Sequence, residues 1–497
     1  MTGRGSSAHR RPLRVGNAPT GVTYARPDGW RGERPSGLAP SRAGKYSSPT
    51  WSLPRTAWPA RRSSRYEDER DAHGQGRDSA LDPRWRCGSA RCWSSRAAAS
   101  KAAVEIGLGV RRRERARLRR PRAGRTLLDI SLKVRHKGTH PCRAMRGGVR
   151  VRAVRFHEFG GPEVLRVEEV PDPIAGPGEV VIDITASALN HLDVDVRQGV
   201  SRFPVELPFI LGIEPVGRIV ELGPGVEGWQ VGERVLPWLM HTCGECRYCR
   251  TGRESLCLSP GFISFTTGGA YAEKLACSTR HLVRVPEQLD DVKAAAVQVA
   301  FATSWHMLFT RARLQPGETI MINSVGSGIG SAAVQLAKMA GAFVIGNASS
   351  DDKLEHAKAL GIDVGINYRE QDVVAEVMRV TEGMGVDVVY EHVGGQSFQW
   401  GLDVLAKDGR LVICGGHAGE VVPFDIIPFF RGQKSVIGSF VYTREEVVTC
   451  LKLAAQGAIT PLVHATFPLE QAREAMEMLE RREHFGKIVL LPQGGAA

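Results

Sequence analysis

The stretch ETIMINSVGSGIGSAAVQLAKMAGAFVIGNASSDDKLEHAKALG, residues 318–361, decides the fold of this chain. It opens with a short apolar, β-rich run over 319–323, of the kind that is buried on both faces of a parallel sheet. A glycine turn follows, then an expected helix over 331–340 and a second apolar strand over 342–347. This strand, turn, helix and strand predict one unit of a doubly wound α/β sheet.

The turn places bare backbone N–H groups and a helix N-terminus at one point, an arrangement that binds pyrophosphate. Its sequence S-V-G-S-G-I-G departs from G-x-G-x-x-G, so the interpretation depends on the flanking strand and helix. A tight strand-to-helix connection without a ligand is the alternative. The expected dinucleotide-binding residues of the turn are Gly326, Ser327, Gly328, Ile329 and Gly330.

The end of the second strand bears on which dinucleotide is bound. An acidic residue about 20 positions after the glycines favours NAD, because it binds the ribose 2′-OH. Here the chain reads Asn347-Ala-Ser349-Ser350, with Lys353 just beyond. Two hydroxyls and an ammonium can hold a 2′-phosphate, although Asp351 and Asp352 lie close by. We therefore expect NADP(H) in preference to NAD(H).

The charge of the chain is divided unevenly. Residues 1–150 contain 35 Lys and Arg against 11 Asp and Glu, whereas the remainder contains 31 against 42. The overall formal charge of +13 thus describes neither part. Residues 1–150 show no sustained apolar period, and we expect a disordered, Arg-rich extension that need not be translated, since Met145 offers another start. A nucleic-acid contact through 111–120 is the alternative.

No apolar run approaches the ~18 residues of a membrane span, and the N-terminus lacks a signal-peptide core. We therefore expect a cytoplasmic protein. Four of the ten cysteines fall at Cys243, Cys246, Cys249 and Cys257, a spacing that can converge on a tetrahedral Zn²⁺ at about 2.3 Å. Four ligands close the coordination, so the sequence predicts one structural zinc. Two disulfides or a reduced loop without metal are the alternatives.

Short β-like runs separated by Pro and Gly fill 151–275 and predict a barrel-like β domain. The signatures G-P-G-E-V, L-G-I-E-P-V-G, V-G-E-R-V, G-G-A-Y-A-E and E-H-V-G-G follow in this order. With them, residues 151–492 resemble the medium-chain dehydrogenase/reductase superfamily, on the branch between zinc alcohol dehydrogenases and quinone oxidoreductases. No such resemblance extends over 1–150.

The resemblance implies an α/β protein with two domains and an active site in the cleft between them. A GroES-like β-barrel catalytic domain with the zinc lobe would comprise 151–298 and 434–497. A Rossmann domain, the doubly wound parallel sheet, would be inserted over 299–433. The resemblance also puts Tyr368 near the phosphorylated ribose of the cofactor, together with Ser349, Ser350 and Lys353.

The resemblance further indicates where a catalytic zinc would be held, and this chain departs from it. The three ligand positions carry Asn190, Ile213 and Val299, and neither Ile nor Val can bind a metal. Glu214 remains at a matching position. A site rebuilt from His191, Asp193, Asp195 or His306 is conceivable, although we interpret His306 as a packed, hydrogen-bonded histidine.

The pattern Asn190-x-x-Asp193-x-x-x-Arg197 instead resembles zinc-free quinone and enone reductases, where the developing enolate needs only hydrogen-bond donors. Asn190 is the expected donor, and Asp193 is expected to pair with Arg197. The position where those reductases often carry Tyr is Asp195. The expected catalytic residues are Asn190, His191 and Asp193.

The expected activity is therefore NADP(H)-dependent reduction of quinones or conjugated carbonyl compounds by hydride transfer, without a catalytic zinc. An alcohol or aldehyde dehydrogenase with a rebuilt metal site is one alternative. A nucleotide-gated regulatory or nucleic-acid-binding protein, acting through its basic tail, is another. We expect a small-molecule substrate, a homo-oligomer and no membrane partner.

Overall fold

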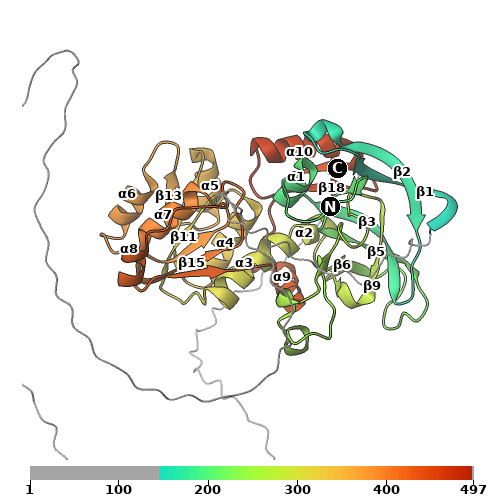
Figure 1. Ribbon diagram of the computed structural model, residues 1–497, viewed down its shortest axis with the longest axis horizontal. Helices are drawn as coiled ribbons and strands as arrows, with labels where there is room; N and C mark the ends of the chain where they lie inside the picture. The colour runs from blue at the N-terminus through green and yellow to red at the C-terminus, as the bar shows by residue number, and fades with distance from the viewer. Residues whose placement is uncertain (1–144, 495–497) are drawn as a thin grey trace, which may run out of the picture. The chain divides into compact units, whose positions relative to one another are not determined.

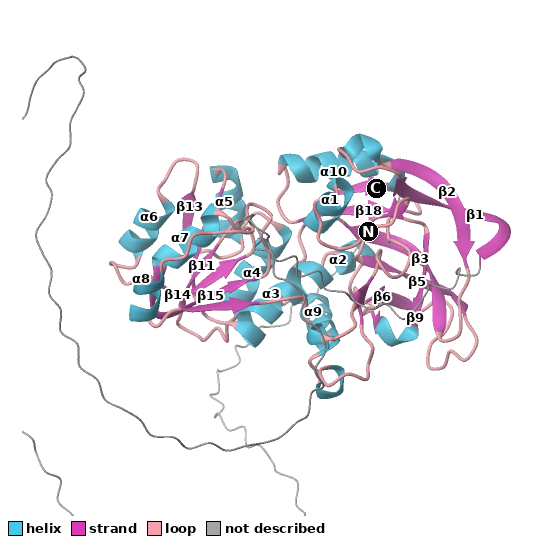
Figure 2. Ribbon diagram, in the orientation of Figure 1, coloured by secondary structure: helices cyan, strands magenta, loops and turns pink. Residues whose placement is uncertain are grey.

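The computed structural model describes residues 145–494. The extension expected over 1–150 thus lies outside the described residues, apart from 145–150, which belong to the first strand, β1 (Met145–Phe156). Figures 1 and 2 show that the described residues form a β-rich part and an α/β part.

The β part is built from three sheets. The largest has the order β10-β6-β5-β3-β18-β17, with β9 also paired to β3, and the others have the orders β2-β1-β4 and β7-β8. The strands after β1 are β2 (Arg166–Pro173), β3 (Glu179–Ala188), β4 (Phe209–Ile210), β5 (Pro215–Leu222), β6 (Arg234–Pro237), β7 (Met240–His241), β8 (Gly261–Phe262), β9 (Lys274–Ser278), β10 (Leu282–Arg284), β17 (Val463–Pro468) and β18 (Lys487–Leu491).

The C-terminal strands complete this β part. β18 runs antiparallel to β3, with Val489 opposite Ala188, and parallel to β17. Val489 and Ala188 are fully buried, so the core of the sheet needs residues from both ends of the described chain. The C-terminal strand thus belongs to the same sheet as β3.

The α/β part is a six-stranded, wholly parallel sheet of order β13-β12-β11-β14-β15-β16. Successive β11 residues point to opposite faces: Ile320 belongs to one core cluster and Met321 to another. The predicted doubly wound sheet is confirmed. Its strands are β11 (Thr319–Ile322), β12 (Phe343–Ala348), β13 (Val364–Asn367), β14 (Val386–Glu391), β15 (Leu405–Ile413) and β16 (Ser435–Gly438).

Helices connect the strands of both parts. Those of the parallel sheet are α4 (Gly328–Met339), α5 (Asp351–Ala359), α6 (Val373–Val380), α7 (Gln396–Val404) and α8 (Ile426–Arg431). The others are α1 (His191–Gln198), α2 (Asp291–Ala295), α3 (Thr303–Trp305), α9 (Arg444–Ala455) and α10 (Ala472–Arg481), with π-helical turns at Gln298–Ala302 and His306–Arg311 on either side of α3.

The predicted domain boundary at residue 433 falls one strand too early. β16 pairs in parallel with β15, with Ile437 opposite Val412, and so forms the edge of the nucleotide-binding sheet. Its four residues SVIG are exposed or half-exposed, so no buried pattern in the sequence marks them as part of this sheet.

Candidate active site

A pocket of about 200 Å³ opens where the parallel strands end. Ser324 follows β11, Ser349 follows β12, and His392 and Cys414 follow β14 and β15. Side chains of the β part close the other side, from α1, from the end of α10 and from β18. The carboxyl ends of parallel strands are where α/β sheets bind their ligands.

Glycine is required in the first turn of α4 (Gly328–Met339) because the backbone packs closely on its neighbours. A Cβ atom on Gly328 would lie 2.6 Å from Cδ of Lys487, and one on Gly330 would overlap the Ser324 carbonyl oxygen. Ser327 caps the helix, since its Oγ accepts from the Gly330 N–H at 2.9 Å. The N-terminus of α4 thus faces the pocket with little side-chain cover, as an anionic phosphate would require.

Most of the predicted cofactor residues meet in this pocket. Those that line it are Gly326, Ser327, Gly328, Ile329, Ser349, Lys353 and Tyr368. Two do not line it. Gly330 is buried and donates its N–H to the Ser327 cap, and Ser350 is the residue that precedes α5.

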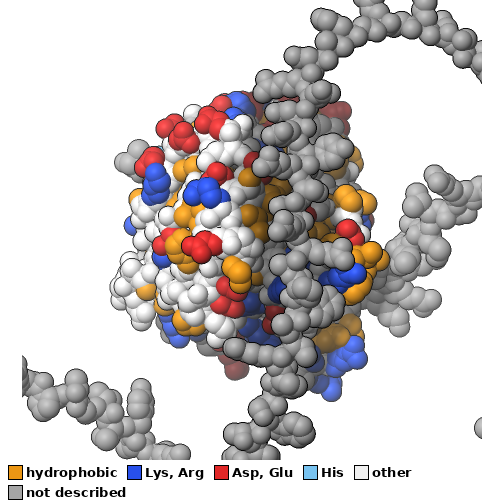
Figure 3. Space-filling model, turned by 90° about the vertical axis from the view of Figure 1, so that its left-hand side faces the viewer, with side chains coloured by type: hydrophobic (Ala, Val, Ile, Leu, Met, Phe, Trp, Pro, Cys, Tyr) orange, Lys and Arg blue, Asp and Glu red, His pale blue; other side chains and the backbone are white. Residues whose placement is uncertain are grey.

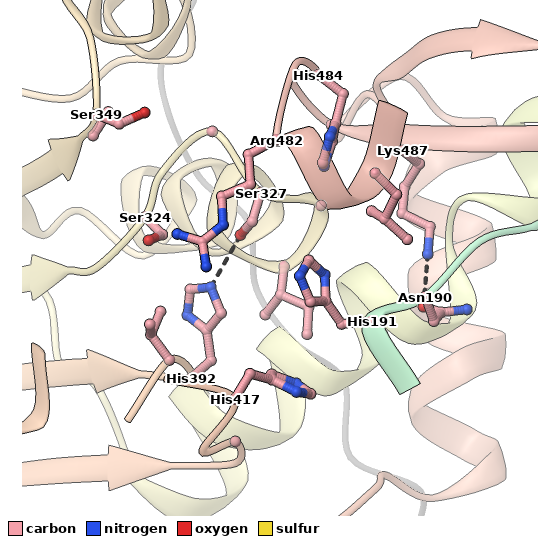
Figure 4. Close-up of a pocket in the computed structure, with 18 of the residues that line it drawn as sticks. Asn190, His191, Ser324, Ser327, Ser349, His392, His417, Arg482, His484 and Lys487 are labelled. Atoms are coloured by element: carbon pink, nitrogen blue, oxygen red, sulfur yellow. Dashed lines mark hydrogen bonds between the residues drawn. The ribbon is translucent and has the colours of Figure 1, made fainter. Parts of the chain in front are cut away.

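The pocket also holds a cation that sequence reasoning missed. Arg482 follows α10 in a left-handed conformation (φ 57°), and Figure 4 shows its guanidinium on the side of Ser324 and Ser327. Its carbonyl oxygen accepts from Nζ of Lys353 at 2.7 Å. Burial, with the nearby Arg369 and Arg482, lowers the pKa of Lys353. Lys353 and Arg482 meet only because the end of α10 packs against the nucleotide-binding part. Their spacing along the sequence could not show this contact.

A buried ammonium occupies the region of the expected catalytic residues. Nζ of Lys487 donates to the Leu189 carbonyl at 2.6 Å, to Oδ1 of Asn190 at 2.7 Å and to Oε2 of Glu214 at 2.9 Å. Glu214 is fully buried and also accepts from the Val299 N–H at 2.6 Å. Burial raises the pKa of the Glu214 carboxyl, while the Lys487 ammonium opposes that rise. The ion pair is satisfied within the protein.

This network leaves Asn190 no free donor. Its side-chain nitrogen bonds both the Ala188 carbonyl, at 3.3 Å, and Oε2 of Glu214, at 3.2 Å. An amide nitrogen has two hydrogens, so both are used. Asn190 lines the pocket as expected, but the role of hydrogen-bond donor to a substrate oxygen is not available to it in this arrangement.

Asp193 lies outside the pocket lining and is buried. It accepts from the Tyr271 hydroxyl at 2.8 Å and from the Asn190 N–H at 2.8 Å, so it holds the start of α1. Burial raises its pKa to about 6. The ion pair predicted between Asp193 and Arg197 is wrong: Arg197 instead pairs with Glu480 of α10.

Four histidines line the pocket, and only His191 is among the expected catalytic residues. Burial lowers the pKa of His191 to about 4, of His392 to about 3 and of His484 to about 4. The fourth, His417, donates to a carboxylate, as described below. Figure 4 shows the rings of His191, His392 and His417 close together. His392 and His417 follow strand ends of the parallel sheet, a position that could have drawn attention to them.

His306, which the sequence offered for a rebuilt metal site, is a packed histidine as we interpreted it. Its Nδ1 lies 2.9 Å from Oε2 of Glu446, and it is 6% exposed. Within residues 145–494, the four predicted cysteines are the one group of His, Cys, Asp and Glu side chains that comes together as metal ligands do.

The geometry of the cysteine lobe fits Zn²⁺. The Sγ atoms of Cys243, Cys246, Cys249 and Cys257 lie within 4.8 Å of one another, with pairs at 3.5, 3.6 and 4.0 Å. A tetrahedron with Zn–S bonds of about 2.3 Å has sulfur atoms about 3.8 Å apart. Backbone N–H groups of Cys243 and Cys246 also point at sulfur atoms of the lobe, at 3.3 and 3.4 Å, as they do around thiolate ligands.

In the described part of the chain, we find no helix with the length and apolar character needed to cross a membrane.

Comparison with known proteins gives two family matches. The alcohol dehydrogenase GroES-like domain matches residues 176–287, and the zinc-binding dehydrogenase domain matches residues 328–456. An NAD-dependent alcohol dehydrogenase of Sulfurisphaera tokodaii is 34% identical over 353 residues, which cover 69% of this chain and 100% of the relative.

Solved structures agree with these matches. A crystal structure of an NAD-dependent alcohol dehydrogenase is 38% identical, with a TM-score of 0.66, and the match covers 68% of this chain and 99% of that one. A mycobacterial quinone oxidoreductase is 28% identical, with a TM-score of 0.57, over 69% of this chain and 100% of that one. The chain therefore belongs to the medium-chain dehydrogenase/reductase superfamily, and it is an oxidoreductase.

Proposed function

We propose that this protein reduces conjugated carbonyl compounds or quinones with NADPH, by hydride transfer and without a catalytic zinc. The observation that carries the proposal is the buried Lys487–Glu214 pair. The Lys487 ammonium pairs with Glu214, the one carboxylate at the positions where the family resemblance implies a catalytic zinc. Ile213 and Val299 stand at two of the ligand positions there. A cation already satisfies Glu214, so a divalent metal ion would have to displace it.

Without a catalytic zinc to act as a Lewis acid, the site favours one class of carbonyl substrate over another. A bound reduced nicotinamide supplies a hydride, and reduction of a simple carbonyl then leaves an alkoxide that a metal usually stabilises. A conjugated acceptor spreads that charge over an enolate or hydroquinone oxygen, for which hydrogen-bond donors are sufficient. This pocket offers imidazole donors instead of a metal, which favours the conjugated substrate.

The preference for NADPH is supported by the charges around the end of β12. Ser349 and Lys353 line the pocket there, and Arg369 lies near enough to Lys353 to affect its pKa. Asp351, which could have repelled a phosphate, accepts a hydrogen bond from Nδ2 of Asn367 at 3.1 Å. The site thus combines hydroxyl and cationic groups suited to a 2′-phosphate.

The test is a matched screen of NADPH and NADH oxidation against an enone, a quinone, a saturated ketone and an aldehyde. The proposal expects turnover of the enone or the quinone with NADPH, and much slower turnover of the saturated compounds. Turnover confined to saturated carbonyls, lost after metal chelation and restored by Zn²⁺, would instead support the alcohol dehydrogenase alternative that the names of the relatives suggest.

The alternative of a regulatory or nucleic-acid-binding protein is tested by removing the basic segment. The deletion should end at residue 144, because residues 145–150 form part of β1 and a cut at 150 would shorten that strand. We expect unchanged kcat and unchanged cofactor affinity, since all pocket-lining residues lie beyond 188. Loss of turnover together with loss of nucleic-acid binding would favour the regulatory alternative.

We also propose that the protein is a homo-oligomer. Apolar side chains are exposed on α8, on the edge strand β16 and on the segments beside them: Val421, Phe424, Ile426, Ile427, Phe430, Val436 and Phe440, here called the α8–β16 patch. Figure 3, which views the side where α6 and α8 lie in Figure 1, shows hydrophobic side chains at the surface among charged ones. An apolar surface beside an unpaired strand edge suits a second copy of the chain.

A further inference from the structure

Two polar groups of the pocket, Asn190 and Lys487, cannot donate to a substrate in this arrangement. Both N–H bonds of the Asn190 amide are used, and Lys487 directs its three N–H bonds at three protein oxygens. Reduction of a carbonyl compound nevertheless consumes a proton as well as a hydride. The proton must therefore come from another group in the pocket.

His417 is placed to provide it. This residue lines the pocket from the turn after β15, and its Nδ1 lies 2.9 Å from Oδ2 of Asp195 on α1. The His417 side chain is 38% exposed and that of Asp195 is 28% exposed, so both have access to water. Asp195, at the position where the resemblance to zinc-free reductases implies Tyr, is paired here with a histidine across the cleft.

Backbone hydrogen bonds hold the turn that carries His417. The Ala418 N–H donates to the Val393 carbonyl at 2.8 Å, and the Gly395 N–H donates to the Gly419 carbonyl at 3.0 Å. A side chain on Gly394 would press on the Gly419 carbonyl oxygen, at 2.6 Å from its Cβ. The turn that carries His417 is thus held against the turn after β14, at the floor of the pocket.

The carboxylate decides which nitrogen of His417 faces the substrate. An ionised carboxylate can only accept, so Nδ1 must carry the hydrogen that it donates to Asp195. Nε2 is then the nitrogen that gains or loses the exchangeable proton. A carboxylate that orients an imidazole in this way also stabilises the imidazolium.

The other pocket histidines are less suited to this task. Burial lowers the pKa values of His191, His392 and His484 to about 4, 3 and 4, so these rings are neutral near pH 7. None of the three has a carboxylate partner among the hydrogen bonds and ion pairs of the described residues. The His191 ring lies 5.2 Å from the His417 ring and could donate a neutral hydrogen bond beside it.

We propose that His417 is the proton donor of the reaction and that Asp195 is its positioning residue. This inference rests on the proposed function and identifies the general acid of that reaction. For a conjugated ketone, the β-carbon gains a hydride from the reduced nicotinamide, and the double-bond pair moves to form an enolate. The enolate oxygen takes the proton from Nε2 of His417, the N–H bond breaks, and the enol becomes the saturated ketone in water. The neutral imidazole regains its proton from solvent.

The pH profile of kcat/KM provides the first readout. The titratable groups facing His417 are Asp195 and His191 from α1 and His392 after β14, and Glu420 lies three residues along the same turn. A donor must be protonated, so activity of the parent enzyme should fall on the alkaline side of the profile. His417→Gln should lower kcat/KM by about 100-fold or more and remove that alkaline limb.

Chemical rescue provides the second readout. Added imidazole should restore part of the rate of His417→Ala, because a free imidazolium can enter the space left by the ring. Asp195→Asn should lower kcat with little change in cofactor Kd, since an amide that donates to Nδ1 selects the wrong tautomer. Asp195→Glu should recover more of the rate than Asp195→Asn does.

A matched control variant distinguishes a catalytic role of His417 from a purely structural contact between α1 and the turn after β15. The pair Arg202–Glu420 also joins the segment after α1 to the turn after β15, but neither residue lines the pocket. Glu420→Gln should therefore keep the rate and pH profile of the parent enzyme. If Glu420→Gln and His417→Gln behave alike, or if His417→Gln keeps the alkaline limb, then His417 is not the donor.

The assay uses whichever substrate class the parent enzyme turns over in the screen, so the two proposals fail separately. Turnover of saturated carbonyls alone contradicts the proposed function, yet His417 would still have to supply the proton to the alkoxide. Good turnover of an enone by both the parent and His417→Gln contradicts the present inference alone. Absence of turnover on every class contradicts both.

Discussion

Single residues decide which chemistry this site can perform. The Lys487 ammonium, the Glu214 carboxylate and the Asn190 amide form hydrogen bonds and an ion pair with protein groups through all their side-chain polar atoms. This network resists rearrangement, because moving the ammonium or the carboxylate away would leave a buried charge without its partner. The groups left to meet a ligand include the imidazoles, the serine hydroxyls and the guanidinium of Arg482, which suit an oxygen-rich, anionic cofactor and an acceptor that needs a proton.

At the same scale, Ala348 tests the cofactor assignment. Ala348 ends β12 and lines the pocket beside Ser349. Ala348→Asp puts a carboxylate there, which should repel a 2′-phosphate and accept a hydrogen bond from a ribose diol. The ratio of kcat/KM for NADPH to that for NADH should fall tenfold or more, and each tenfold step corresponds to about 1.4 kcal/mol.

The matched control is Ala348→Asn, which has the same shape without the charge. It should change the cofactor ratio far less, although both variants place a polar group at a position that is 2% exposed. If the parent enzyme already prefers NADH, or if the aspartate and asparagine variants give the same ratio, the assignment to NADPH fails.

The buried His392 predicts a pH dependence of stability. Its pKa is lowered to about 3 by burial, so between pH 6.5 and 3 the unfolded chain binds a proton at this residue that the folded chain does not. Its contribution therefore destabilises the fold as the pH falls through that range. His392→Gln should flatten the decline of the unfolding free energy between pH 7 and 4.5, by at most about 1.4 kcal/mol per pH unit.

Urea unfolding at a series of pH values measures this difference. His464→Gln, at an exposed histidine on β17, serves as the control and should leave the slope of the parent protein. If the unfolding free energy of the parent protein and of His392→Gln changes with pH in the same way, protonation of His392 does not contribute to the pH dependence of stability.

Among the elements, the cysteine lobe between β7 and β8 contains only short turns and is held by its sulfur atoms. We therefore expect Cys246→Ser to remove the zinc and to lower the thermal midpoint by several degrees, because a structural metal contributes folding free energy directly. The hydride-transfer rate of the protein that remains folded should change little. Metal content and unfolding are measured on the same preparation.

The control for this lobe is Cys450→Ser, at a fully buried cysteine on α9. It should also lower stability, since it buries a hydroxyl in the core, but it should keep one zinc per chain. Loss of zinc from both variants, or a stable zinc-free Cys246→Ser protein, would argue against a structural metal in this lobe.

The sequence predicted those elements whose signal is local. The apolar run of β11, the glycine turn and the four cysteines each depend on neighbours a few residues away, and the structure places all of them as expected. The edge strand β16 was missed because it lacks a buried pattern. Arg482 and His417 were missed because their roles arise from contacts between residues more than 100 positions apart.

On the scale of the whole molecule, the α8–β16 patch predicts the oligomeric state. Phe430→Glu places a charge on a side chain that is 59% exposed within the patch, and it should dissociate the oligomer. Val231→Glu, at a side chain 62% exposed on the β part, is the control and should not. Light scattering after size-exclusion chromatography measures the mass. A parent protein that is monomeric at micromolar concentration, or a Phe430→Glu oligomer of unchanged mass, would contradict the proposal.

The most direct test of the central claim is where the hydride goes. NADPH labelled with deuterium at the transferred position of C4 is allowed to react with an α,β-unsaturated ketone, and the product is analysed by NMR. We predict a saturated ketone with deuterium on the β-carbon, because the site stabilises an enolate with hydrogen-bond donors and needs no metal. An allylic alcohol with deuterium on the carbinol carbon and an intact double bond would contradict the account.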